Sequence, residues 1–242
     1  MRAIDILRQE VPTISVGILT ADLLALGNDL SRLEGTGVRV LHVDVMDGCF
    51  VPMMTVGPPL IKAIKTSMLK DAHLMIEDPV EKIDAYVAAG ADILTVHVES
   101  DTHIHRVFQK LAKLANANDP ARGLVRGAAL NPGTPLTVLE PLLDDLEMVS
   151  LLAVNPGWKG QSFIPSTRSR ILDLKRMIAD RGKAILVCVD GGVTRANIGE
   201  LAGTGVDIVV TGSAVFDGKA PAENARSMLE ELRAGSGKAV AD

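Results

Sequence analysis

Residues 40–45 read Val-Leu-His-Val-Asp-Val, a short apolar run that carries two polar side chains. Side chains two positions apart on a β-strand point to the same face of the sheet. His42 and Asp44 are therefore predicted to project together near the end of a strand, and Met46 follows them on the same face. If strands of this kind close into a barrel, that face is the barrel interior.

Runs of the same kind recur along nearly the whole chain. Eight of them are predicted to be strands: residues 14–19, 40–45, 71–75, 93–98, 125–130, 148–154, 184–190 and 207–211. Longer amphipathic stretches lie between the runs, such as residues 80–89 and 171–181, and are predicted to be helices. The alternation is typical of βα units on a parallel sheet, and eight units favour a closed (β/α)8 TIM barrel over an open doubly wound sheet.

The length of the chain fits one barrel. At 242 residues it is expected to form a single domain over residues 1–242. Residues 1–12 precede the first predicted strand and are expected to be an N-terminal extension, while residues 235–242 are expected to be a disordered tail. Aromatic residues make up only 2% of the chain against 47% apolar residues, so the core is predicted to consist of aliphatic side chains and Met.

The composition argues against several classes of partner. A net charge of -5 and the scarcity of aromatic residues argue against nucleic acid. No run approaches the roughly 18 uncharged apolar residues of a membrane span, and the charged residues 1–12 lack the apolar core of a signal peptide. Cys49 and Cys188 are the only cysteines and suggest no disulfide framework. We therefore expect a cytoplasmic protein without a membrane partner.

Four ionisable side chains stand near the ends of these apolar runs: His42, Asp44, His73 and Asp190. In a (β/α)8 barrel the carboxyl ends of the strands meet at one mouth, so the four are predicted to converge there. Burying such groups without partners costs several kcal/mol each. Two imidazoles and two carboxylates could instead hold one divalent metal ion, beside carboxylates able to move protons. The sequence therefore predicts a metalloenzyme.

Other polar and soft side chains allow more than one interpretation. His97 and Glu99 repeat the spacing of His42 and Asp44, and are either outer partners of the site or a satisfied buried polar pair; we favour the second interpretation. Met46 and Met75 each follow a predicted ligand by two residues. Core packing is the usual role of Met, but here both are expected to line the cavity and exclude water.

Glycines follow the last three predicted strands. Glycine lets backbone N–H groups approach an anion, and barrel enzymes often bind phosphate with the loops after their last strands. One glycine pair alone is more often a plain turn, but three at consecutive strand ends predict a phosphate site. Its candidate residues are Gly157, Trp158, Lys159, Gly160, Gly191, Gly192, Gly212 and Ser213.

These motifs closely resemble the ribulose-phosphate 3-epimerase family from about residue 14 to residue 216. The resemblance covers residues 18–22, 50–52, 96–99, 130–135, 154–157 and 212–216, together with His42-Val43-Asp44-Val45-Met46-Asp47-Gly48, His73-Leu74-Met75 and Val189-Asp190-Gly191-Gly192-Val193. It implies a TIM barrel of the ribulose-phosphate-binding type and a homo-oligomeric isomerase of the pentose phosphate pathway.

The resemblance also implies a role for each site residue. His42, Asp44, His73 and Asp190 would hold the metal, and Asp44 and Asp190 would also form the acid/base pair that inverts C3 through a metal-stabilised enediolate. Zn²⁺ suits this ligand set, with Fe²⁺, Mn²⁺ and Co²⁺ as alternatives. The implied substrate is a ketose phosphate, D-ribulose 5-phosphate giving D-xylulose 5-phosphate. It would contact His73, Met46 and Met75, with its phosphate on the glycine loops.

Departures from the family pattern keep other substrates open. Gly17, Cys49, Met53 and Leu152 stand where the family commonly has Ser, His, Asn and Met, and the loop at 157–161 also differs. A 3-epimerase acting on D-allulose 6-phosphate, another hexulose 6-phosphate or a tetrulose phosphate is therefore an alternative.

Two further alternatives belong to different functional classes. A decarboxylase or lyase on the same fold would need a lysine where Met46 stands, which argues against it. A non-catalytic sugar-phosphate-binding protein is disfavoured because both aspartates are present.

Overall fold

The computed structural model describes residues 1–218 and 220–237. Eight parallel strands form a closed barrel in which each strand pairs with its neighbours in the chain, and β1 pairs with β8. The strands are β1 Thr13–Gly17, β2 Val40–Met46, β3 Leu69–Met75, β4 Ile93–His97, β5 Val125–Leu130, β6 Met148–Leu152, β7 Leu186–Asp190 and β8 Ile208–Thr211. The predicted (β/α)8 barrel is confirmed, and each predicted run overlaps one strand.

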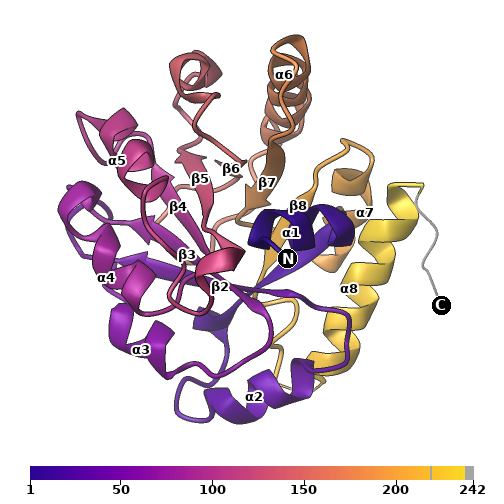
Figure 1. The fold of residues 1–242 in the computed structure, drawn as a ribbon. Helices are drawn as coiled ribbons and strands as arrows, with labels where there is room; N and C mark the ends of the chain where they lie inside the picture. The colour runs from indigo at the N-terminus through magenta and orange to yellow at the C-terminus, as the bar shows by residue number, and fades with distance from the viewer. Residues whose placement is uncertain (219, 238–242) are drawn as a thin grey trace.

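Helices surround the barrel, as Figure 1 shows. The α-helices are α1 Ala3–Glu10, α2 Leu26–Leu33, α3 Pro58–Ala63, α4 Ile83–Ala88, α5 Ile104–Leu111, α6 Thr167–Asp180, α7 Arg195–Ala202 and α8 Pro221–Gly235. Short 3₁₀ helices are η1 Ile18–Thr20, η2 Pro79–Glu81, η3 Pro120–Arg122 and η4 Leu136–Leu142. Within residues 1–218 and 220–237, no helix is both long and apolar enough to cross a membrane.

Several predicted boundaries differ from the observed ones. The helix predicted over residues 80–89 is divided into η2 and α4, with Asp78 in the left-handed region at φ 45° directly before η2. Residues 18–19, predicted as the end of the first strand, lie in η1. Helix α8 extends to Gly235, the first residue of the predicted tail, and residues 238–242 lie outside the described residues. Cys49 is exposed, Cys188 is buried, and both are free thiols.

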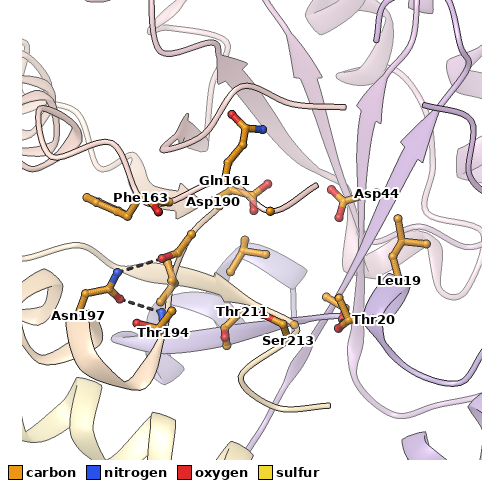
Figure 2. A pocket seen from close by; sticks show the side chains of 18 of the residues that line it. Leu19, Thr20, Asp44, Gln161, Phe163, Asp190, Thr194, Asn197, Thr211 and Ser213 are labelled. Atoms are coloured by element: carbon orange, nitrogen blue, oxygen red, sulfur yellow. Dashed lines mark hydrogen bonds between the residues drawn. The ribbon is translucent and has the colours of Figure 1, made fainter. Parts of the chain in front are cut away.

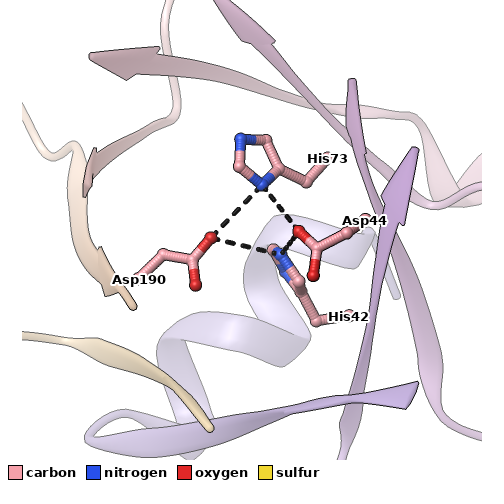
Figure 3. Close-up of side chains that lie close together, drawn as sticks. All are labelled: His42, Asp44, His73 and Asp190. Carbon is pink, nitrogen blue, oxygen red and sulfur yellow. Dashed lines mark hydrogen bonds and ion pairs between the residues drawn. The ribbon is translucent and has the colours of Figure 1, made fainter. Parts of the chain in front are cut away.

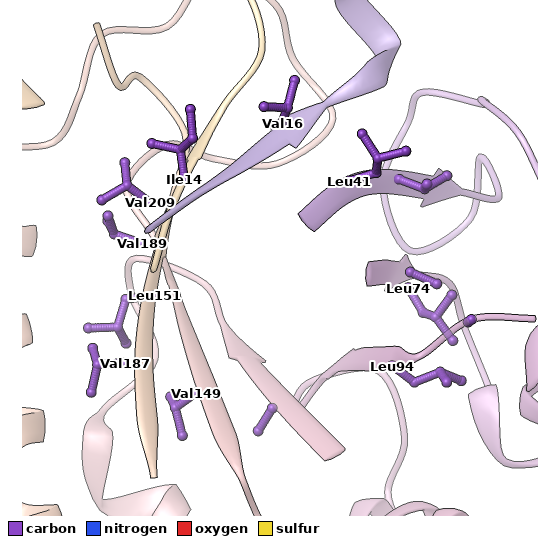
Figure 4. Packing of buried hydrophobic residues seen from close by; sticks show 14 of the residues in the cluster. Ile14, Val16, Leu41, Leu74, Leu94, Val149, Leu151, Val187, Val189 and Val209 are labelled. Carbon is purple, nitrogen blue, oxygen red and sulfur yellow. The ribbon is translucent and has the colours of Figure 1, made fainter. Parts of the chain in front are cut away.

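Alternate strand residues face opposite sides of the barrel wall. One set points outward and packs under the helices, forming an aliphatic layer that includes Val16, Leu41, Leu74, Val149 and Val189 (Figure 4). This layer is continuous around the barrel because each strand contributes apolar residues to it. The predicted aliphatic core is thus placed between the strands and the helices.

The other set points into the barrel and is apolar at the N-terminal ends of the strands. Val40, Leu69, Ile93, Val125, Met148, Leu186 and Ile208 form a cluster there with Ala3, Ile4 and Leu7 of α1. Figure 1 shows α1 lying across the centre of the ring of strands. The predicted N-terminal extension therefore closes one end of the barrel, which leaves the carboxyl ends of the strands for a polar site.

Candidate metal centre and active site

The four predicted ligands meet inside the barrel near its carboxyl end (Figure 3). One nitrogen of each histidine and one oxygen of each aspartate lie within 4.8 Å of one another. Asp44 Oδ1 is 3.0 Å from both His42 Nε2 and His73 Nδ1. Asp190 Oδ2 is 3.5 Å from the same atom of His42 and 3.2 Å from the same atom of His73. The four side chains, which come from three strands, therefore form one cluster.

Strand register brings these residues together. In the pairing of β2 with β3, Asp44 lies opposite His73 and His42 lies opposite Asp71. His42 and Asp44 on β2 are two positions apart, and so are Asp71 and His73 on β3. All of these side chains therefore point into the barrel. Asp190 is the last residue of β7, across the barrel. The alternation that places aliphatic residues outward therefore places the polar ones inward.

The two carboxylates of the cluster require a compensating positive charge. Burial lowers the pKa of His73, but hydrogen bonds to Asp190 and Asp44 outweigh burial and raise it to about 9. Burial raises the pKa values of Asp44 and Asp190, but the two histidines outweigh it and lower both. Two ionised carboxylates in a buried site need positive charge, which either protonated imidazoles or a metal ion can supply. The nitrogen and oxygen donor set fits a divalent transition metal ion.

His42 is held from behind by a carboxylate. Its Nδ1 is 2.8 Å from Asp71 Oδ2, and the other oxygen of Asp71 accepts a hydrogen bond of 3.1 Å from the hydroxyl of Thr95. Histidines that bind metals usually donate their second N–H to a carboxylate, carbonyl or water. The arrangement leaves Nε2 of His42 facing the cluster.

His73 is held from behind by a second imidazole. Its Nε2 is 3.0 Å from Nε2 of His97, and the two rings stack with centroids 5.1 Å apart. His97 Nδ1 is 3.1 Å from Glu99 Oε2. His97 is buried and paired with Glu99, as our favoured interpretation expected, and it also contacts a predicted ligand, as the alternative interpretation expected.

A cavity above the cluster has two lobes that share Asp44 and Asp190. The first lobe, of about 790 Å³, we call the glycine lobe (Figure 2). Its walls include the predicted phosphate-site residues Gly160, Gly191, Gly192, Gly212 and Ser213. The predicted glycines after three consecutive strands therefore lie in one wall.

The glycine lobe presents free backbone donors. Within the described part of the chain, the N–H groups of Gly191, Gly192 and Ser213 donate no hydrogen bond to another residue. Asn197 holds this segment in place, since its amide donates to the Gly192 carbonyl at 3.0 Å and accepts from the Thr194 N–H at 2.8 Å (Figure 2). Such N–H groups around a cavity can bind an anion.

The second lobe, of about 620 Å³, we call the methionine lobe. Met46 and Met75 line it as predicted, together with Met53 and Leu152. Gly157, Trp158 and Lys159 form another part of its wall, and Trp158 is 61% exposed. The lobe thus offers an apolar surface beside the two carboxylates.

His42 and His73 lie beneath this cavity. Their side chains are 2% and 0% exposed, and neither is among the described residues that line the two lobes. His73 was predicted to contact a substrate, but its side chain does not line either lobe of the cavity. Asp44 and Asp190 form the boundary between the cluster and the open space.

Sequence reasoning missed several residues of the site. Asp71 lies two residues before His73 on the same inward face, so the alternation that identified His42 and Asp44 could have found it. Gln161 holds the loop after β6 by donating to the Trp158 carbonyl at 3.0 Å, and Asn197 holds the loop after β7. Both contact backbone atoms three residues away, Asn197 as part of a capping box with Thr194, so this short spacing could have found them.

Comparison with known proteins gives consistent relatives. The model of the Ribulose-phosphate 3 epimerase family matches residues 13–216. The ribulose-phosphate 3-epimerase of Bacillus subtilis is 42% identical over 206 residues, covering 84% of this chain and 91% of that protein. The corresponding protein of Escherichia coli K12 is 38% identical over 224 residues, covering 91% and 94%.

Solved structures share the fold at lower identity. The crystal structure of KGPDC from Streptococcus mutans superposes with a TM-score of 0.68 at 15% identity, covering 93% of this chain and 98% of that one. The 3-hexulose-6-phosphate synthase of Salmonella typhimurium gives a TM-score of 0.66 at 20% identity, covering 92% and 99%. These likenesses support the barrel architecture.

Proposed function

Because this chain belongs to the ribulose-phosphate 3-epimerase family of isomerases, we propose that it interconverts D-ribulose 5-phosphate and D-xylulose 5-phosphate by inverting C3. The reaction moves one proton off C3 and another onto its opposite face. It therefore needs two groups that exchange protons, placed on either side of the substrate carbon.

The observation that carries the proposal is the position of Asp44 and Asp190. They come from strands β2 and β7, approach the cluster from two sides in Figure 3, and both line the two lobes of the cavity. One carboxylate would remove the C3 proton, leaving an enediolate. The other, initially protonated, would deliver a proton to the opposite face of C3. The two exchange roles when the reaction runs in reverse.

A divalent ion would be held by His42, Asp44, His73 and Asp190, and when bound it would act as a Lewis acid that stabilises negative charge on the substrate oxygens. Zn²⁺ suits these ligands, while Fe²⁺, Mn²⁺ and Co²⁺ are alternatives. The methionine lobe, with Met46 and Met75, would exclude water from the reacting carbon.

The phosphate would bind at the far end of the substrate from C3. The glycine lobe is suited to it, with donors at Gly191, Gly192 and Ser213 beside Gly160 and Gly212. Gly157, Trp158 and Lys159 adjoin this region from the loop after β6. Backbone amides bind an anion without the entropy cost of ordering long cationic side chains.

One observation favours a second candidate substrate. Gly17 lines the glycine lobe, and a side chain there would first meet Gly212 Cα at 3.7 Å, so its absence leaves usable room. A longer ketose phosphate such as D-allulose 6-phosphate is the candidate that this room favours. In either case we propose a cytoplasmic homo-oligomer, to be checked by size-exclusion chromatography with light scattering.

Proton NMR in D₂O tests the proposal. The enzyme is incubated in turn with D-ribulose 5-phosphate, D-allulose 6-phosphate and a tetrulose phosphate, and loss of each carbon-bound hydrogen signal is followed. We expect the C3 hydrogen to exchange with solvent while the 3-epimer accumulates, fastest with the true substrate. Binding of all three without exchange at any carbon would instead favour a sugar-phosphate-binding protein.

A further inference from the structure

His73 has a partner at each ring nitrogen, and only one of these atoms can face a metal ion. Nδ1 lies 3.0 Å from Asp44 and 3.2 Å from Asp190. Nε2 lies 3.0 Å from Nε2 of His97. When two imidazole nitrogens face each other, one must carry the hydrogen and the other must accept it. The direction of this single hydrogen bond decides whether Nδ1 of His73 has a lone pair for the metal.

Glu99 determines that direction. One of its oxygens, Oε1, accepts the backbone N–H of Asn131 at 2.8 Å and the hydroxyl of Thr134. The other, Oε2, is 3.1 Å from Nδ1 of His97. An ionised carboxylate can only accept, so His97 carries its hydrogen on Nδ1 and has a lone pair on Nε2.

The lone pair on His97 then sets the hydrogen on His73. Nε2 of His73 must donate to it, which makes Nδ1, the nitrogen that faces Asp44 and Asp190, the one that gives up its hydrogen when a metal ion binds. We propose that Glu99 is a positioning residue that acts through His97 to present Nδ1 of His73 to a divalent metal ion. This inference rests on the metal site of the proposed function.

The segment that holds Glu99 is itself anchored to the outer layer of the barrel. Arg170 of helix α6 donates to the Thr134 carbonyl at 2.8 Å and to the Asn131 carbonyl at 3.5 Å. Asn131 and Thr134 follow β5, within the stretch 130–135 that resembles the family. Both residues hold the Glu99 carboxylate in place, and this carboxylate sets the hydrogen positions of His97 and His73.

Asp71 orients His42 much as Glu99 orients His97, by accepting a hydrogen bond from its Nδ1. The two carboxylates differ in the group that binds their other oxygen. The other oxygen of Asp71 accepts from the Thr95 hydroxyl, which can rotate and become an acceptor. An amide at position 71 could therefore keep its carbonyl toward His42. An amide at position 99 could not do the same, because the Asn131 N–H is a fixed donor and claims the carbonyl. The NH₂ group would then face His97 and reverse both imidazole hydrogen bonds.

Metal affinity is the first test, measured on the full-length metal-free protein by Zn²⁺ and Co²⁺ competition with a chromogenic chelator. We expect Glu99→Gln to weaken affinity about 10–100-fold, the range found for outer partners of metal ligands. Asp71→Asn should weaken it less. Glu147→Gln is the matched control, since Glu147 is a half-buried carboxylate paired with Arg126 before β6, at the opposite end of the barrel. Equal affinities for the Glu99 and Glu147 variants would overturn the proposal.

The second test reads the hydrogens directly and needs no variant to fold. The chain has 5 histidines, so ¹⁵N-histidine labelling gives a small set of resonances for long-range ¹H–¹⁵N NMR. In the Zn²⁺-loaded wild type we expect His97 protonated on Nδ1 and His73 on Nε2. The opposite tautomer of His97 would overturn the proposal. Both measurements omit substrate, so an inactive protein that passes them would contradict the epimerase function but not this inference.

Discussion

The two ends of the barrel interior are built from the same strands and serve opposite purposes. At the N-terminal end, the inward residues are aliphatic and pack against Ile4 and Leu7 of α1. At the carboxyl end, the inward residues of the same strands include His42, Asp44 and His73. On β2 and β3 the change occurs over two residues, from Val40 to His42 and from Leu69 to Asp71. Stability and chemistry therefore occupy separate layers of a single wall.

The two layers also differ in what keeps them buried. Aliphatic burial is favourable by itself at about 25 cal/mol per Å². The polar layer is tolerated only because every charge in it has a partner: Asp44 contacts both histidines, and Asp71 and His97 hold those histidines from behind. Substitutions at the two ends should therefore change different measurable quantities.

Removal of the metal should have the largest effect on the chemical end. Dialysis against a chelator is expected to abolish C3 exchange, and added Zn²⁺, Co²⁺, Mn²⁺ or Fe²⁺ should restore it to different degrees. Metal analysis of the purified protein identifies the native ion. The metal-free protein should also unfold at a lower temperature, because an ion that binds only the native state stabilises it by mass action. Full activity in excess chelator, with no metal detected, would contradict the assignment of the cluster.

Asp44→Asn and Asp190→Asn should each lower C3 exchange by about 10²–10⁴-fold, the usual contribution of general acid–base catalysis. Each variant keeps the shape of the side chain, so circular dichroism should still report a folded barrel. Asp207→Asn is a useful control, because Asp207 precedes β8 at the far end and pairs with Lys175. Wild-type exchange rates in both site variants would refute the acid/base pair.

Gly192→Ala tests the glycine lobe and should lower kcat/KM by about 10²-fold, the cost of a misplacement near 1 Å. Gly192 has φ +66°, and a Cβ there would lie 2.5 Å from the backbone nitrogen of Phe163, so the turn must shift. Gly27→Ala is the matched control, since a Cβ at Gly27 meets nothing within 4 Å. Steady-state kinetics of both variants makes the comparison, and an unchanged kcat/KM for Gly192→Ala would place the phosphate elsewhere.

Leu7→Ala should leave turnover almost unchanged and act on the other end of the barrel. Leu7 is fully buried, so its truncation should lower the free energy of unfolding by about 2–5 kcal/mol. Leu24→Ala, at a fully exposed leucine, should leave stability unchanged. Urea unfolding followed by circular dichroism gives the values. A large loss of kcat in Leu7→Ala at temperatures where it is folded would show that the two layers are coupled.

The sequence allowed the barrel and the cluster to be predicted because both depend on alternation within single strands. His42 and Asp44 share a face by spacing alone, and the closed topology brings Asp190 to them. The roles of His97 and Glu99 depend on a contact between neighbouring strands and on a loop after β5, which no local spacing encodes. The break between η2 and α4 was likewise hidden, because the helical pattern of residues 80–89 continues across it.

The closure of one end by α1 also bears on how a metal ion leaves. Ala3, Ile4 and Leu7 fill the N-terminal end with apolar atoms, so an ion at His42 and His73 would escape through the mouth. That route passes Asp44 and Asp190 and the place proposed for the ketose phosphate. Bound substrate would thus cap the ion, and a chelator should strip metal more slowly from the saturated enzyme than from the free one.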